Sequence, residues 1–109
     1  MSYLTDPEPK HDYRRVTYDG KTVNIRTRTM LQRAEAMAGR RFSLVQGSYN
    51  VGVKASAGTH DGGGCVDLNV YGLTVAARTS VIQALRKAGF AAWYRTPAQG
   101  FSPHIHAVA

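Results

Sequence analysis

The sequence predicts a single small α+β domain with a mostly antiparallel sheet, two main helices and an N-terminal β-hairpin. Segments of strand and helix character follow one another without strict alternation, which favours an α+β arrangement. The chain has 109 residues, a length that suits one compact domain, and 43% of them are hydrophobic, as globular domains require. No repeat or Pro/Gly-rich linker divides it. We therefore expect an irregular, polar tail over residues 1–12 and one folded domain over residues 13–109.

The first element of that domain is the hairpin. Asp19 and Gly20 stand between two β-prone segments, residues 13–18 and residues 21–25. An Asp-Gly pair in this setting is the strongest short-range signal for a two-residue hairpin turn.

A helix is expected after the hairpin, with Thr27 or Thr29 as its N-cap. Its apolar positions recur at helical spacing: Met30, Ala34, Met37 and Ala38. Gly39 stands where a left-handed residue would end the helix.

The second helix is expected to begin after Thr74, a good N-cap, and to end at Gly89. One of its faces carries Val81, Leu85 and Ala88. Four other segments have strand character: residues 42–46, 66–70, 90–95 and 104–108. A glycine-rich loop, residues 47–64, joins the first two of these strands.

Composition limits the classes of function. The net charge of +7 favours an anionic partner such as nucleic acid, a membrane surface or a bacterial cell wall. The basic residues are scattered, however, so specific nucleic-acid binding is not expected. No apolar run approaches the roughly 18 residues of a membrane span. The lone cysteine, Cys65, excludes a disulfide framework and a thiolate-cluster zinc site. No secretory signal is visible, so we expect synthesis in the cytoplasm.

The chemistry is concentrated in His60, Asp67, His104 and His106. Side chains alternate along a strand, so His104 and His106 should share one face, about 6–7 Å apart. Glycines in the preceding loop let the backbone fold back, so that His60 and Asp67 can converge. Imidazole and carboxylate groups suit zinc, and three protein ligands leave a fourth position for water, as in catalytic sites. Spacing alone also permits both histidines of the His-x-His segment on one zinc.

Several motifs occur in order along residues 13–109: Ser48-Tyr-Asn, Gly58-Thr-His-Asp-Gly-Gly-Gly, Val66-Asp, Gly89-Phe-Ala-Ala-Trp and Ser102-Pro-His-Ile-His-Ala. Together they resemble the zinc peptidases that cut bacterial peptidoglycan, a group that includes D-alanyl-D-alanine carboxypeptidases, murein endopeptidases and lysostaphin-like enzymes. The match is closest to the peptidase domain of endolysins from phages of actinobacteria.

This resemblance implies one zinc ion held by His60, Asp67 and His106, with His104 beside it as the catalytic residue. It also implies a substrate, the stem or cross-bridge peptide of peptidoglycan, and a monomer that acts on the cell wall after release from the host cytoplasm. A wall-binding module that keeps zinc without turnover is the alternative.

The chain departs from the family pattern in its general base. Carboxypeptidases of this group have a glutamate where this sequence has Pro103, and no carboxylate side chain follows Asp67. We therefore expect His104 to move the proton, with Asp61 as the weaker candidate.

Substrate contacts are expected from Gln46, Ser48 and Tyr49, which stand where relatives have Ser-Gly-Tyr-Arg. The arginine that binds the substrate carboxylate in those relatives is missing here. Phe90 and Trp93 are expected in the core rather than on a substrate platform.

Cys65 precedes Asp67 by two residues and should share its strand face. We expect it to be a small buried residue, the alternative being an adventitious zinc ligand.

Overall fold

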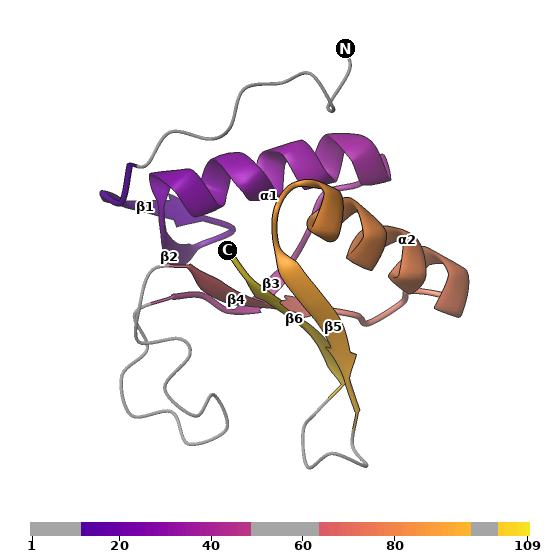
Figure 1. Cartoon of the computed structure of the whole chain (residues 1–109). Helices are drawn as coiled ribbons and strands as arrows, with labels where there is room; N and C mark the ends of the chain where they lie inside the picture. The colour runs from indigo at the N-terminus through magenta and orange to yellow at the C-terminus, as the bar shows by residue number, and fades with distance from the viewer. Residues whose placement is uncertain (1–11, 49–63, 97–102) are drawn as a thin grey trace.

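The computed structural model describes residues 12–48, 64–96 and 103–109. Most of the expected N-terminal tail and of the glycine-rich loop lies outside these residues. The described elements follow in this order (Figure 1): β1 (Arg15–Tyr18), β2 (Lys21–Asn24), α1 (Ile25–Ala38), β3 (Leu44–Gln46), β4 (Cys65–Asn69), α2 (Val75–Lys87), β5 (Ala91–Arg95) and β6 (His104–Val108).

The strands form two antiparallel sheets, which confirms the predicted α+β class. One is the two-stranded hairpin of β1 and β2, and the other has four strands in the order β3-β4-β6-β5. Both helices lie on the same side of the four-stranded sheet (Figure 1). The predicted strand segments agree with the observed bounds of β3 to β6 to within two residues.

The hairpin turn is formed by Asp19 and Gly20, as predicted. Both have positive φ, 49° and 71°, which a two-residue turn needs if its twist is to match that of the strands. The Asp19 side chain also accepts a hydrogen bond from the Leu44 amide at 2.8 Å. The turn is thereby tied to the first strand of the larger sheet.

Helix α1 begins earlier than expected. Asn24, the last residue of β2, is the N-cap, and its side chain accepts a hydrogen bond from the amide of Thr27 at 2.7 Å. The prediction of Thr27 or Thr29 as the cap is therefore wrong. Asparagine caps at least as well as threonine, so the chain passes directly from strand to helix. Gly39 ends the helix with φ of 70°, as predicted.

Helix α2 begins as predicted. Thr74 is the N-cap and accepts a hydrogen bond from the amide of Ala77 at 3.0 Å. The C-cap is Ala88, and Gly89 follows with φ of 109°.

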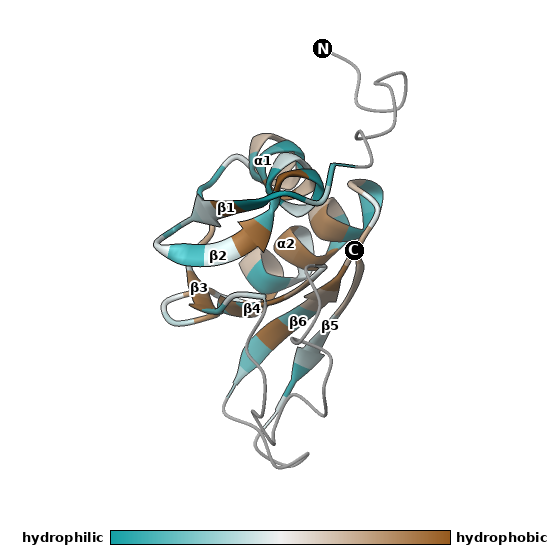
Figure 2. Cartoon of the chain, turned by 90° about the vertical axis from the view of Figure 1, so that its left-hand side faces the viewer, coloured by the Kyte–Doolittle hydropathy of each residue, from teal (hydrophilic) through white to brown (hydrophobic). Residues whose placement is uncertain are grey.

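The hydrophobic core lies between the helices and the four-stranded sheet. Alternate residues of the two central strands belong to it: Val66, Leu68, Ile105 and Ala107. Figure 2 shows this alternation of hydrophobic and hydrophilic positions along β6. The other residues of these strands must therefore point to the sheet face that is opposite the helices. Within the described residues, no helix is long and apolar enough to cross a membrane.

Candidate metal centre

The register of the strands brings the candidate site residues together on the sheet face that is opposite the helices, which we call the polar face. Asp67 of β4 lies directly opposite His106 of β6, and Asn69 lies opposite His104. Directly paired residues of an antiparallel ladder project to the same face. Asp67, His104 and His106 therefore share one side of the sheet, with His104 and His106 on one strand face as the sequence predicts.

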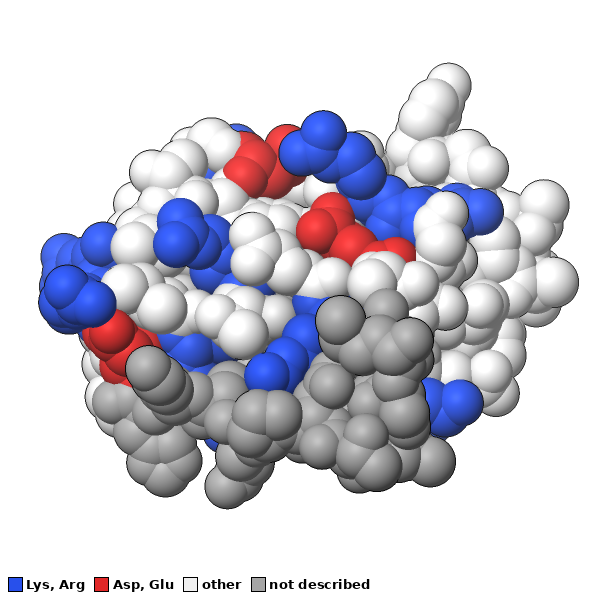
Figure 3. Space-filling view, turned by 90° about the horizontal axis from the view of Figure 1, so that it is seen from above, with Lys and Arg blue, Asp and Glu red and all other residues white. Residues whose placement is uncertain are grey.

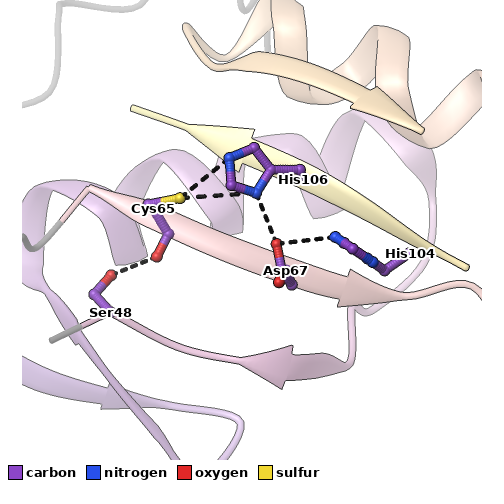
Figure 4. Close-up of polar contacts among 5 residues, drawn as sticks. All are labelled: Ser48, Cys65, Asp67, His104 and His106. Carbon is purple, nitrogen blue, oxygen red and sulfur yellow. Dashed lines mark hydrogen bonds and ion pairs between the residues drawn. The ribbon is translucent and has the colours of Figure 1, made fainter. Parts of the chain in front are cut away.

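The three side chains converge on a small region (Figure 4). His106 Nδ1 lies 2.8 Å and His104 Nε2 lies 3.4 Å from the same oxygen, Oδ1 of Asp67. One candidate ligand atom from each residue lies within 4.8 Å of the other two, and all three residues are buried. The structure thus assembles two imidazoles around one carboxylate.

Burial and hydrogen bonding act in opposite directions on His106. Burial lowers the pKa of its imidazole, whereas the hydrogen bonds to Asp67 and Cys65 raise it, and the net result is a raised pKa. An ionised carboxylate is acceptor-only, so Nδ1 carries the proton and donates to Asp67. The other ring nitrogen, Nε2, lies 3.5 Å from Sγ of Cys65.

Cys65 is buried, as expected, and its contact with His106 was not foreseen. Its backbone carbonyl accepts a hydrogen bond from the Ser48 hydroxyl at 2.8 Å (Figure 4). This bond joins the second residue after β3 to the strand that carries Asp67.

The donor set fits a transition metal. Two imidazole nitrogens and one carboxylate oxygen are ligands that zinc binds, and three protein ligands are typical of its catalytic sites. Asp67, His104 and His106 could therefore hold a metal ion.

Two of the three predicted ligands, Asp67 and His106, lie together. His104, expected beside the metal, also comes within ligand distance of them. His60 and Asp61 lie outside the described residues, so their roles stay predictions.

A cavity of about 330 Å³ lies next to β3 and the hairpin. Its lining residues are Arg15, Lys21, Thr22, Val45, Gln46, Gly47 and Ser48. It thus includes two of the expected substrate-binding residues, Gln46 and Ser48, while the third, Tyr49, lies outside the described part of the chain.

Gln46 of β3 pairs with Asp67 of β4, and its buried Nε2 has no hydrogen-bond partner among the described residues. The two cations beside this cavity, Arg15 and Lys21, were not predicted as site residues.

Trp93 lies on the polar face of the sheet rather than in the core. It pairs with His106 across β5 and β6, the two ring centroids are 4.9 Å apart, and it is 38% exposed. Its expected core position is therefore wrong, whereas Phe90 is in the core, as predicted. The alternation of side chains along β5 could have predicted this position. Ala92 points into the core, so the next residue, Trp93, must point away from it.

Charge is dispersed over the face of the molecule that is seen from above. On the face seen in Figure 3, Lys and Arg side chains are interspersed with Asp and Glu and with uncharged residues.

Comparisons of the chain with protein-family models, with curated proteins and with solved structures find no match. The residues of the site are therefore the basis for inferring a function.

Proposed function

We propose that the chain is a zinc-dependent peptidoglycan hydrolase, a phage endolysin domain that cleaves an amide bond in the stem or cross-bridge peptide of the cell wall. The observation that carries this proposal is the convergence of Asp67, His104 and His106 on one face of the sheet. The order of the His60, Asp67 and His-x-His motifs along the chain supports it.

Asp67 and His106 would hold the zinc ion in either of two ligand sets, completed by His60 or by His104. A zinc ion bound there would supply Lewis-acid polarisation of the scissile carbonyl and a water of lowered pKa. We favour His60 as the third ligand, because His104 is then available for proton transfer.

His104 is the residue that we assign to proton transfer. It shares a strand face with His106, and its Nε2 lies 3.4 Å from Asp67. No carboxylate side chain follows Asp67 in the sequence, so no glutamate of the usual kind is available. An imidazole can carry a proton to the leaving amine near neutral pH, since its ordinary pKa is about 6.5.

Net charge is consistent with a wall substrate. A protein of charge +7 accumulates on an anionic polymer by long-range attraction. This attraction raises the concentration of the protein at the wall, but it does not determine which bond is cleaved.

A zinc-containing module that binds the wall without cleaving it is the second candidate. Pro103 favours it, because it replaces the glutamate that acts as general base in related carboxypeptidases. Such a module would need the metal for folding and would need no proton shuttle.

Digestion of purified peptidoglycan tests the two candidates against each other. The protein is incubated with walls in three states: as purified, after chelation, and after return of zinc. Mass spectrometry identifies the released peptides. A hydrolase releases new amine termini in the first and third states only. Sedimentation with the walls and no released peptide in any state would favour the binding module.

A further inference from the structure

Two side chains of β5, Trp93 and Arg95, stand beside the metal centre. Trp93 pairs with His106 and Arg95 pairs with His104 across the same two strands, so both project to the polar face. The Trp93 ring lies 4.9 Å from the His106 ring, and Cζ of Arg95 lies 5.6 Å from the Trp93 centroid. An imidazole, an indole and a guanidinium thus follow one another along this edge of the site.

The exposure of Trp93 calls for a physical reason. Trp93 is 38% exposed although its indole is among the largest hydrophobic groups, and Ala92 takes the core position beside it. Tryptophan and arginine are also the residues most enriched where proteins bind partners through a few strong contacts.

Arg95 brings a guanidinium group to this edge. Asp67, the carboxylate of the site, is engaged by both histidines on β6. A guanidinium offers a planar fork of donors that matches a carboxylate in two parallel hydrogen bonds.

We propose that Trp93 and Arg95 form the substrate-binding flank of the metal centre, where Arg95 pairs with a carboxylate of the peptide and the Trp93 ring packs on an adjacent apolar part. The proposal rests on the proposed function, since it takes the substrate to be a wall peptide. Stem peptides carry free carboxylates, so this pair would select which part of the peptide lies over the metal.

The second aromatic–arginine pair of β5 offers a matched control. Arg78 of α2 stacks on Tyr94 with Cζ 3.9 Å from the ring centroid. Tyr94 is adjacent to Trp93 in the strand and therefore projects to the opposite face. Replacement of Arg78 removes a contact of the same kind without altering the edge of the metal centre.

Trp93 is the single tryptophan of the chain, so its fluorescence reports binding at this edge directly. The probes are a purified stem tetrapeptide and the same peptide with its carboxyl groups amidated. Each is titrated into zinc-loaded wild type, Arg95→Gln, Arg95→Lys and Arg78→Gln. Zinc content and circular dichroism are measured for every protein.

We expect wild type and Arg78→Gln to bind the native peptide at least about tenfold more tightly than the amidated one. Arg95→Gln should lose this preference and keep its zinc, and Arg95→Lys, which retains the charge without the fork, should keep only part of it. If Arg95→Gln fails to fold, Arg95→Lys decides. A reduced preference of Arg95→Lys for the native over the amidated peptide supports the proposal, and an undiminished preference counts against it.

Equal binding of the two peptides to wild type, or no binding of either, would overturn the proposal even if peptidoglycan is cleaved. An unchanged preference in Arg95→Gln would also overturn it. Conversely, a carboxylate preference that depends on Arg95 in a protein that cleaves nothing would sustain this inference and refute the hydrolase. The two proposals can therefore fail separately.

Discussion

Asp67 and His106 face each other across β4 and β6, with Oδ1 and Nδ1 2.8 Å apart. Both are buried, and only 1% of the His106 surface is exposed. A buried carboxylate and a buried imidazole each lose hydration, a loss that their mutual hydrogen bond offsets. The pair therefore links the stability of the two central strands to the candidate metal centre.

The two histidines of β6 should differ in their roles. His106→Ala should lose zinc and activity together, because it removes a ligand. His104→Ala should keep most of its zinc and lose turnover by about 10²–10⁴-fold, the usual contribution of general acid–base catalysis. Zinc content and peptidoglycan cleavage are measured on both variants.

Equal loss of zinc in the two variants would assign His104 to the ligand set. Full activity in His104→Ala would place the proton shuttle elsewhere, with Asp61 as the residue to test next.

Removal of the metal should lower thermal stability. A ligand that binds the folded state alone stabilises it by about 4 kcal/mol when present at a thousand times its dissociation constant. For a domain of this size, 1 kcal/mol corresponds to a shift of about 4–8 °C in Tm. Calorimetry with and without chelator measures the shift, and returned zinc should reverse it.

Asp67→Asn is the matched control for chelation, since it retains the shape of the side chain and removes the ligand charge. Its Tm should not respond to chelator. A response as large as that of wild type would mean that the stabilising metal binds elsewhere.

Gly47 should not tolerate a side chain. A Cβ atom there would lie 2.8 Å from Cβ of Lys21 and 2.8 Å from the carbonyl oxygen of Thr22. That carbonyl already accepts a hydrogen bond from the Ser48 amide, so the hairpin cannot move away freely. Gly47→Ala should lower the free energy of unfolding by about 1–3 kcal/mol.

Gly64→Ala is the control for Gly47→Ala in urea denaturation. Its new Cβ would meet Ala109 at 3.4 Å, an ordinary contact, so its midpoint should stay close to that of wild type. Equal midpoints for the two variants would contradict the close approach of β2 to the end of β3.

Tyr18 should make stability depend on pH in the alkaline range. Burial, followed by the charges of Glu35 and Asp19, raises the pKa of its hydroxyl. The unfolded chain loses this proton at about pH 10 and the folded chain at higher pH. The contribution of Tyr18 is thus complete below pH 10, and above it the free energy of unfolding falls by up to about 1.4 kcal/mol per pH unit.

Tyr18→Phe should flatten this decline, as denaturant titrations at pH 8 to 11 would show. Tyr71→Phe is the control, because Tyr71 is 93% exposed and should leave the slope unchanged. Identical slopes for Tyr18→Phe and wild type would exclude Tyr18 as the source.

Local signals predicted much of the fold. The turn of Asp19 and Gly20, the cap at Thr74 and the end of α1 at Gly39 each depend on the conformational preference of one or two residues. The cap at Asn24 was not predicted, because the sequence pattern assigns this residue to a strand. In the structure Asn24 is both the last residue of β2 and the N-cap of α1. Trp93 was placed in the core by its hydrophobicity, whereas the alternation of β5 assigns the core to Ala92.

In the site, the common face of His104 and His106 could be predicted from the sequence, since alternation along one strand is a local property. The meeting of this face with Asp67, which is 39 residues from His106 in the chain, depends on the packing of the whole domain. The antiparallel register of β4 and β6 sets that meeting, and the burial of Val66, Leu68, Ile105 and Ala107 beneath the helices specifies the register. A shift of one residue would turn these apolar side chains to the polar face. The same packing that forms the core therefore brings the carboxylate and the imidazoles together.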